Sequence, residues 1–237
     1  MHCINIMSTL DVHIFGVRER EHMLEATAVK LGIDKAHIHY DDRPNGGCVM
    51  YTAKKAWLAD IPNEITHRVV LQDDVEACNG AIEIWQEMVN THPDAIFSLC
   101  PFQYPRKQVE LDNLLTPYLE ANTMSACGII MPVKYIKPCF DWIDEHHPDA
   151  KEDDFYIERW AEVHSVRRLT TIPATVQHIG DKSVYTPTAP IRRTAYYEEN
   201  PKVDWGNHMI GILPHREWFF SNHGKQYATE GEVKYVS

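Results

Sequence analysis

Several features that would assign a protein to a familiar class are missing from these 237 residues. The sequence has no apolar run of about 18 residues, the length that a membrane-spanning helix needs. The first residues lack a basic region followed by a long apolar stretch, so we expect no secretory leader. The six cysteines show neither a C-x-x-C pair nor the spacing of a zinc finger. We therefore expect reduced thiols, a cytoplasmic location and no membrane partner.

Basic residues are also fewer than acidic ones. The chain carries 34 acidic against 23 basic residues and a formal net charge of -11. This balance argues against non-specific binding to nucleic acid backbones or to anionic membranes, although a local basic strip is compatible with it. The 14 histidines are numerous, so the net charge should rise noticeably below about pH 6.5.

Internal repeats and low-complexity segments are absent as well. Hydrophobic residues make up 44% of the chain, enough to fill the core of one large α/β domain or two small ones. Strand patterns alternate with helix patterns, which predicts an α/β fold with a mostly parallel sheet and helices on both sides. The expected strands are 11–17, 36–40, 66–71, 95–99 and one within 125–132, and the expected helices are 18–31, 49–58, 81–89 and a broken stretch at 111–119.

Two adjacent carboxylates follow the central strand. Val69, Val70 and Leu71 are typical of a strand that is buried on both faces, and Asp73 and Asp74 come where it should end. Ligands of open α/β sheets collect beyond the carboxyl ends of the strands, and a divalent cation can stabilise two acids there. The same pair also suits a turn followed by a helix N-cap, so these residues alone leave both interpretations open.

A pair of arginines follows the first strand. Arg18 and Arg20 lie at the predicted strand end, where cations are well placed to meet a diphosphate. Because Glu19 and Glu21 are interleaved with them, the arginines are equally compatible with a solvated first turn of the helix that is expected to stop at Gly32.

A second acidic cluster opens a later helix. Glu152, Asp153 and Asp154 fall in its first turn, where the helix dipole and capping favour acids. Three in a row exceed what a cap requires. A carboxylate at the rim of an apolar cleft can also act as a general base toward a hydroxyl, with its pKa raised by partial burial.

The third motif is Gln177-His178-Ile179-Gly180 at the end of a predicted strand. A neutral imidazole at this place can complete a metal site, and a glycine lets the chain turn beneath a phosphate. A hydrogen-bonded structural histidine is the alternative interpretation.

In their order along the chain, these three motifs resemble nucleotide-sugar glycosyltransferases of the A-type fold. The resemblance runs from about Val12 to Ser183 and is greatest to small enzymes of phage and bacterial genomes. It implies one Rossmann-like catalytic domain at 1–185. A C-terminal extension at 186–237, rich in large aromatic rings, is expected to wrap the domain or to contact a second subunit as in a homodimer.

The resemblance also implies roles for the site residues. Asp74 and His178 would hold Mn²⁺ or Mg²⁺ against the two phosphates of the donor, with Asp73 facing the ribose or sugar. Asp153 or Asp154 is the candidate base if the reaction inverts the anomeric carbon, and these acids orient a sugar if it retains. The further residues implied in nucleotide binding are Arg18, Asn45, Gly46, Gly180 and Ser183.

The implied reaction moves a sugar from a nucleoside-diphosphate sugar, a UDP-sugar first, to an acceptor hydroxyl. A hydroxymethylated pyrimidine in phage DNA is the first acceptor to consider, because the resemblance is to phage-type enzymes and Arg192 and Arg193 lie beside aromatic residues that suit bases. The location would then be the host cytoplasm. A surface glycan or a protein as acceptor, a metal-dependent nucleotidyltransferase and a non-catalytic nucleotide-sugar-binding module stay open.

Overall fold

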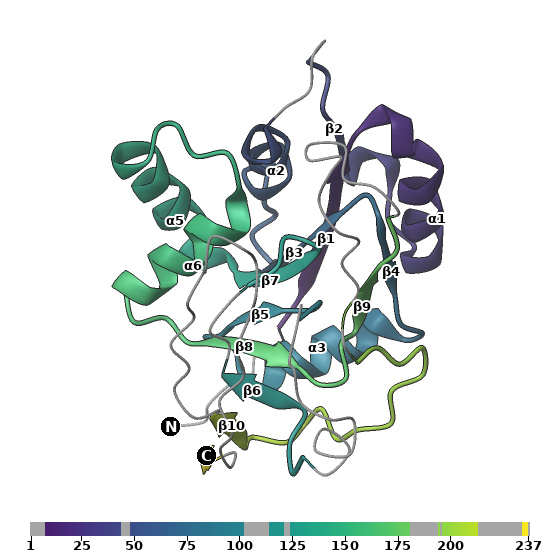
Figure 1. Cartoon of the computed structure of the whole chain (residues 1–237), viewed down its shortest axis with the longest axis vertical. Helices are drawn as coiled ribbons and strands as arrows, with labels where there is room; N and C mark the ends of the chain where they lie inside the picture. Colours follow the sequence, from purple (N-terminus) through teal and green to yellow (C-terminus); the bar gives the residue numbers. More distant parts are fainter. Residues whose placement is uncertain are drawn as a thin grey trace, which may run out of the picture.

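One large mixed sheet flanked by helices forms the framework of the molecule (Figure 1). The computed structural model describes residues 8–43, 48–101, 114–120, 124–180, 194, 196–212 and 234–236, and all structural statements refer to these. Within them, every helix is too short or too polar to cross a lipid bilayer.

The large sheet has nine strands in the order β11-β10-β6-β8-β5-β7-β3-β1-β2. Six of them, β1, β2, β3, β5, β8 and β11, run in one direction, and β6, β7 and β10 run in the other. The strands are β1 (Leu10–Gly16), β2 (Ile38–Tyr40), β3 (His67–Gln72), β5 (Ile96–Ser98), β6 (Tyr118–Glu120), β7 (Gly128–Pro132), β8 (Arg168–Thr171), β10 (Ile210–Ile212) and β11 (Lys234–Val236). The predicted mostly parallel α/β sheet is thus confirmed in a mixed form, which is compatible with a Rossmann-like fold.

A second, two-stranded sheet lies beside the first. It pairs β4 (Val75–Ala77) with β9 (Val176–His178) in antiparallel register, so that Val75 faces His178. Since β4 starts directly after the two acids that follow β3, this small sheet carries the late histidine motif to the end of the central strand.

Helices cover both faces of the large sheet, as predicted. The helices are α1 (Glu21–Leu31), α2 (Val49–Trp57), α3 (Ala81–Thr91), α5 (Val133–His146) and α6 (Asp153–Val163), with short 3-10 turns η1 (Arg18–Arg20) and η2 (Lys35–His37). Helices α1 and α3 pack with Val69 and Leu71 in one buried cluster, and α2, α5 and α6 pack with Val70 in the other. The alternation of side chains along β3 explains why three apolar residues in a row are needed there.

The predicted stop of the first helix at Gly32 is confirmed. Gly32 has a φ of 66°, and its N–H reaches the carbonyls of Ala28 and Val29. A residue with a side chain would be strained in this left-handed conformation, which is why glycine ends the helix.

The predicted broken helix at 111–119 is wrong for the part that the structure describes. Residues 118–120 form β6, which pairs with β8 and joins the large sheet. Tyr118 and Leu119 are both fully buried, and the Tyr118 ring lies 6.1 Å from the rings of Phe97 and Trp205. Tertiary packing has therefore overridden a local pattern that Pro117 had already weakened.

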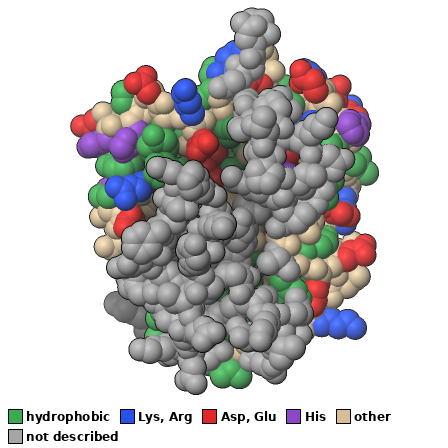
Figure 2. Space-filling model, in the orientation of Figure 1, with side chains coloured by type: hydrophobic (Ala, Val, Ile, Leu, Met, Phe, Trp, Pro, Cys, Tyr) green, Lys and Arg blue, Asp and Glu red, His purple; other side chains and the backbone are tan. Residues whose placement is uncertain are grey.

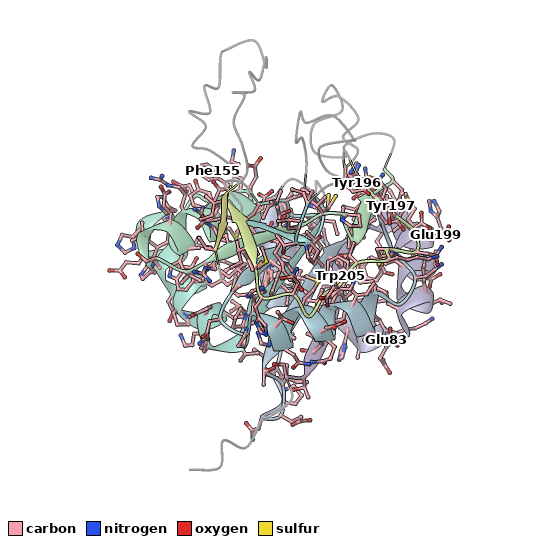
Figure 3. All side chains as sticks on the ribbon, turned by 90° about the horizontal axis from the view of Figure 1, so that it is seen from below. Glu83, Phe155, Tyr196, Tyr197, Glu199 and Trp205 are labelled. Carbon is pink, nitrogen blue, oxygen red and sulfur yellow. The ribbon has the colours of Figure 1, made fainter. Side chains whose placement is uncertain are left out.

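The described part of the C-terminal extension packs against the domain. The carbonyl of Tyr196 accepts a hydrogen bond of 2.7 Å from the Ala174 N–H, and that of Glu199 accepts one of 2.8 Å from Asn79. Trp205 is buried, and Figure 3 shows it deeper in the molecule than Tyr196. With β10 added next to β6, the extension contributes strands to the same sheet.

Candidate active site

The carboxyl ends of β1 and β3 lie side by side and bring the first strand to the two acids. These strands are parallel, and Phe15 is level with Gln72. The Val17 N–H donates a hydrogen bond of 2.8 Å to Asp73 Oδ2. A Cβ on Gly16 would overlap the Asp73 side chain, so glycine is required at this strand end to admit the carboxylate.

Arg20 contacts both acids. The turn η1 places Arg20 so that its Nη1 donates to Asp73 Oδ1 at 3.1 Å. The same nitrogen donates a short hydrogen bond to Asp74 Oδ2. The Arg20 side chain is 15% exposed and the carboxylates are almost fully buried. One guanidinium bound to two carboxylates leaves a net negative charge at the strand end, which is the charge state that attracts a further cation.

His178 completes the group from the small sheet. Its Nε2 lies 3.0 Å from Asp74 Oδ2, and the Ile179 N–H donates a hydrogen bond of 2.8 Å to the Asp74 carbonyl. A Cβ on Gly180 would collide with Asp74 Oδ2 and lie 3.0 Å from Asp74 Cβ. The glycine of the late motif therefore makes room for the acid.

The two adjacent acids differ in their electrostatics. Burial and the charge of Asp74 raise the pKa of Asp73 to about 6, against the opposing effects of the Val17 N–H and Arg20. Burial also favours a raised pKa at Asp74, but the hydrogen bond from His178 and the charges of His178 and Arg20 outweigh it and lower this pKa. Asp74 is thus the permanent anion, while Asp73 titrates near neutrality.

Helix α6 supplies a further acid at the same end of the sheet. Asp154 Oδ2 accepts a hydrogen bond of 3.0 Å from the Ala126 N–H, and Glu158 accepts one of 3.0 Å from Met124. The adjoining Cys127 carbonyl accepts a hydrogen bond from the Gln72 N–H. Asp154 is therefore linked through one short segment to the residue that precedes the two strand-end acids.

The structure separates the two acids that sequence reasoning proposed as alternative bases. Asp153 is only 1% exposed and lies in the core, where Trp57 Nε1 donates it a hydrogen bond of 3.1 Å. Burial and the charge of Asp154 raise its pKa to about 7. A side chain enclosed in this way does not meet an acceptor from solvent, so Asp154 is the member of the pair that fits a base.

Of the other predicted nucleotide contacts, the structure describes Arg18. Arg18 is 64% exposed on its side chain, pairs with Glu21 at 2.8 Å and lies 3.6 Å over the Tyr40 ring. It is Arg20 that contacts the acids. The predicted contacts Asn45, Gly46 and Ser183 lie outside the described residues.

Sequence reasoning undervalued Arg20 and did not find Gly16. The only signal for Arg20 was its place two residues after Arg18 at a strand end, and the sequence does not show which of them turns inward. Gly16 carried the signal of a glycine at a strand terminus.

A divalent ion fits the donor set at Asp74. Asp74 Oδ1 is buried and has no hydrogen-bond partner among the described residues, and His178 Nε2 lies 3.0 Å from the other oxygen of the same carboxylate. Carboxylate and imidazole together suit Mn²⁺, and such ions take their remaining ligands from substrate phosphates and water. In the described part of the chain, a full set of three ligand atoms within 4.8 Å of one another occurs only elsewhere, at Asp11, His13 and His37.

No known family model matches the chain, and the search of curated proteins found no match either. On the face seen in Figure 2, acidic and basic side chains of the described residues are interspersed, and these residues form no broad basic surface there. The geometry at the ends of β1 and β3 is therefore the basis for assigning a function.

Proposed function

We propose that this protein is a glycosyltransferase that moves a sugar from a nucleoside-diphosphate sugar to an acceptor hydroxyl. One observation carries the proposal. Asp73, Asp74, Arg20 and His178 converge at the carboxyl ends of the parallel strands β1 and β3. Open α/β sheets bind nucleotides at this edge, and a buried acid with an unpartnered oxygen is suited to a cation that accompanies phosphates.

The donor diphosphate is the group that this charge arrangement suits. The leaving nucleoside diphosphate gains about one negative charge in addition to those of its phosphates when the glycosidic bond breaks, and cations held at the site stabilise this charge. Arg20 can turn its planar guanidinium to phosphate oxygens, which it binds in the same paired manner as carboxylates. Asp74 and His178 would hold Mn²⁺, which supplies Lewis-acid stabilisation of that charge when bound. A UDP-sugar is the donor proposed first.

The acceptor side is proposed to lie at the start of α6. Asp154 would take the proton of the acceptor hydroxyl if the reaction inverts, or orient a sugar if it retains. Phe155, next to it, has a half-exposed ring, and Figure 3 shows Phe155 and Tyr196 toward the same side of the molecule. An exposed ring beside a base offers a stacking surface for a sugar or a nucleobase.

Phage DNA stays the acceptor proposed first, on the sequence resemblance. The arginines that would meet DNA, Arg192 and Arg193, lie outside the described residues. An acceptor held as a single extruded base needs fewer phosphate contacts than a bound duplex, which suits a chain with a net charge of -11.

A hydrolysis screen of nucleotide sugars with and without Mn²⁺ tests the proposal. We expect one nucleoside diphosphate to be released in a Mn²⁺-dependent reaction that Asp74→Asn abolishes. Asp94→Asn is the matched control, because Asp94 is exposed and pairs with Lys134. Binding of nucleotide sugars without turnover, even with acceptors present, would instead identify a binding module. Release of pyrophosphate from nucleoside triphosphates would identify a nucleotidyltransferase.

A further inference from the structure

A second polar cluster lies at the opposite, amino-terminal end of β1, outside the site described above. Asp11 and His13 are two residues apart on β1 and so point to the same face of the sheet. Arg68 of β3 is level with Asp11, five residues before Asp73. His37 ends the turn η2 and His39 lies in β2, which pairs with β1 at the edge of the sheet (Figure 1). Three histidines and one carboxylate are thus gathered between β1 and the segment that leads into β2.

The distances in this cluster suit a tetrahedral metal ion. His13 Nε2 lies 2.9 Å from Asp11 Oδ2, and His37 Nδ1 lies 3.7 Å from Asp11 Oδ1. One ligand atom from each of the three residues falls within 4.8 Å of the other two. Ligands at zinc–nitrogen distances of about 2.0–2.1 Å are separated by about 3.3 Å in a tetrahedron, so the ring nitrogens of His13 and His37 each lie near this distance from one of the two Asp11 oxygens.

The surroundings already hold the buried ligands in place. Arg68 donates through Nε and Nη2 to Asp11 Oδ2, which leaves Oδ1 directed to His37. His39 Nε2 lies 2.8 Å from His13 Nδ1 and fixes the ring of His13. Partners of this kind orient the ligands and set the imidazole tautomer at metal sites, and their loss typically weakens metal binding by about 10- to 100-fold.

Arg68 is held in place by backbone carbonyls as well as by Asp11. Its Nη1 donates to the carbonyls of Ala56, Trp57 and Ala59 at 2.8–3.0 Å, around the end of α2. Carbonyls at a helix C-terminus carry partial negative charge. Arg68 is thus fixed on Asp11 Oδ2, and Asp11 Oδ1 is the oxygen that stays accessible to a second cation.

The hydrogen bonds of His13 are compatible with two arrangements of its ring proton. The measured distances are satisfied when His39 donates to His13 Nδ1 and His13 Nε2–H donates to Asp11. A shift of tautomer along this chain frees His13 Nε2 for a metal without a net loss of protons.

We propose that Asp11, His13 and His37 form a zinc-binding site that joins β1 to the turn η2, which precedes β2. His37, whose side chain is 41% exposed, is the ligand that closes the site. Its ring is now stacked on His13 with centroids 4.4 Å apart and must rotate so that Nδ1 points to the ion. The fourth position is left to water from the exposed side. Three protein ligands with one open position are typical of accessible zinc sites.

Titration of the full chain with Zn²⁺ by calorimetry, and with Co²⁺ by visible absorption, tests the site. We expect one equivalent of Zn²⁺ to bind and Co²⁺ to give the absorption of a tetrahedral complex. The substitution His37→Gln should weaken binding by about tenfold or more. It changes an exposed ring and leaves the Asp11–Arg68 pair intact, so the variant should fold.

Two matched variants locate the ion. His22→Gln alters an exposed histidine on α1 and should leave binding unchanged, and Asp74→Asn should also retain it, because the strand-end acids belong to the other site. Absence of tight binding, retention of full affinity in His37→Gln, or loss of binding in Asp74→Asn would each overturn the proposal. A thiolate charge-transfer band with Co²⁺ would do so as well, because it would assign the metal to cysteine.

Discussion

Asp74 and His178 are 104 residues apart in the chain, and their side chains meet at 3.0 Å. The pairing of β4 with β9 produces this contact, since His178 faces the residue directly after Asp74. Two separate pieces of chain therefore meet at one buried carboxylate whose second oxygen has no hydrogen-bond partner among the described residues. Any substitution that changes the space around this carboxylate should change what the site binds.

Gly180→Ala tests this spatial requirement. The added Cβ would collide with Asp74 Oδ2, so either the acid or β9 must move. We expect a loss of stability of about 1–3 kcal/mol, which is typical of overpacking, together with a loss of the thermal stabilisation by UDP-sugar and Mn²⁺. Thermal unfolding with and without the two ligands measures both effects.

Gly206→Ala is the matched control. A Cβ at Gly206 would lie 3.2 Å from Glu87 Oε1 and 3.3 Å from Asp204 Oδ1, which are ends of side chains that can shift. This variant should keep the ligand-dependent stabilisation. Equal behaviour of the two variants would show that Gly180 is not required for the geometry of Asp74.

Arg20→Gln should destabilise the protein, because it leaves two buried carboxylates without their cation. The expected loss is about 2–4 kcal/mol, somewhat below the roughly 3–5 kcal/mol of a fully buried pair, because Arg20 keeps some solvent contact. Removing this cation should raise the pKa of Asp73 above its present value of about 6. The variant should then lose stability as the pH rises through that range. Urea denaturation at pH 5 and pH 8 measures both effects.

Arg18→Gln is the companion variant. The Arg18 side chain is largely exposed and its ion pair with Glu21 is on the surface. Such pairs contribute about 0–1 kcal/mol, so we expect a small change without the same pH dependence. A larger effect of Arg18 than of Arg20 would contradict the assignment of the inner cation.

The fold could be predicted from the sequence where local patterns and packing agree. The apolar run of Val69, Val70 and Leu71 indicated a strand buried on both faces, and Gly32 indicated a helix end. The antiparallel direction of β7 was not predictable, because an apolar run has the same pattern in either direction. Strand β6 was missed because its pairing with β8 depends on residues about 50 positions later in the chain.

The candidate site was predictable only in outline. The order of the motifs pointed to Asp74 and His178, but no local pattern predicts that β4 pairs with β9. The choice between Arg18 and Arg20 depends on how η1 turns after β1, and the separation of Asp153 from Asp154 depends on how α6 docks on the core. These are tertiary properties, and the local sequence is compatible with either outcome.

Asp153→Asn should stabilise the protein above neutral pH. The folded-state pKa of Asp153, about 7, lies above its ordinary value of 3.8, so the folded state favours the protonated form. The stability that this form contributes is full below about pH 4 and is lost as the pH rises through 7. Asparagine mimics the neutral acid at every pH. We expect a gain of roughly 2–4 kcal/mol at pH 8, since one pKa unit corresponds to about 1.4 kcal/mol.

Chemical denaturation of the wild type and of Asp153→Asn at pH 5 and pH 8 checks this prediction. The difference between the two proteins should be small at pH 5 and larger at pH 8. Glu152→Gln is the control, because Glu152 is exposed one residue earlier. A difference that is the same at pH 5 and at pH 8 would show that Asp153 is ionised in the folded protein.

Asp154→Asn should remove sugar transfer and spare donor binding if Asp154 is the base of an inverting reaction. Asp154 accepts from Phe155 through Oδ1 and from Ala126 through Oδ2, and asparagine keeps one of these two acceptors, so the fold should be retained with some loss of stability. Loss of a general base typically lowers turnover by about 10²- to 10⁴-fold. We expect kcat to fall by this factor, with the affinity for UDP-sugar and Mn²⁺ unchanged.

Inversion at the anomeric carbon, which NMR of the product detects, must accompany this loss. A variant with full activity and an inverted product would show that Asp154 only caps α6, and it would turn attention to Glu158, whose pKa is raised by burial one turn further along the helix.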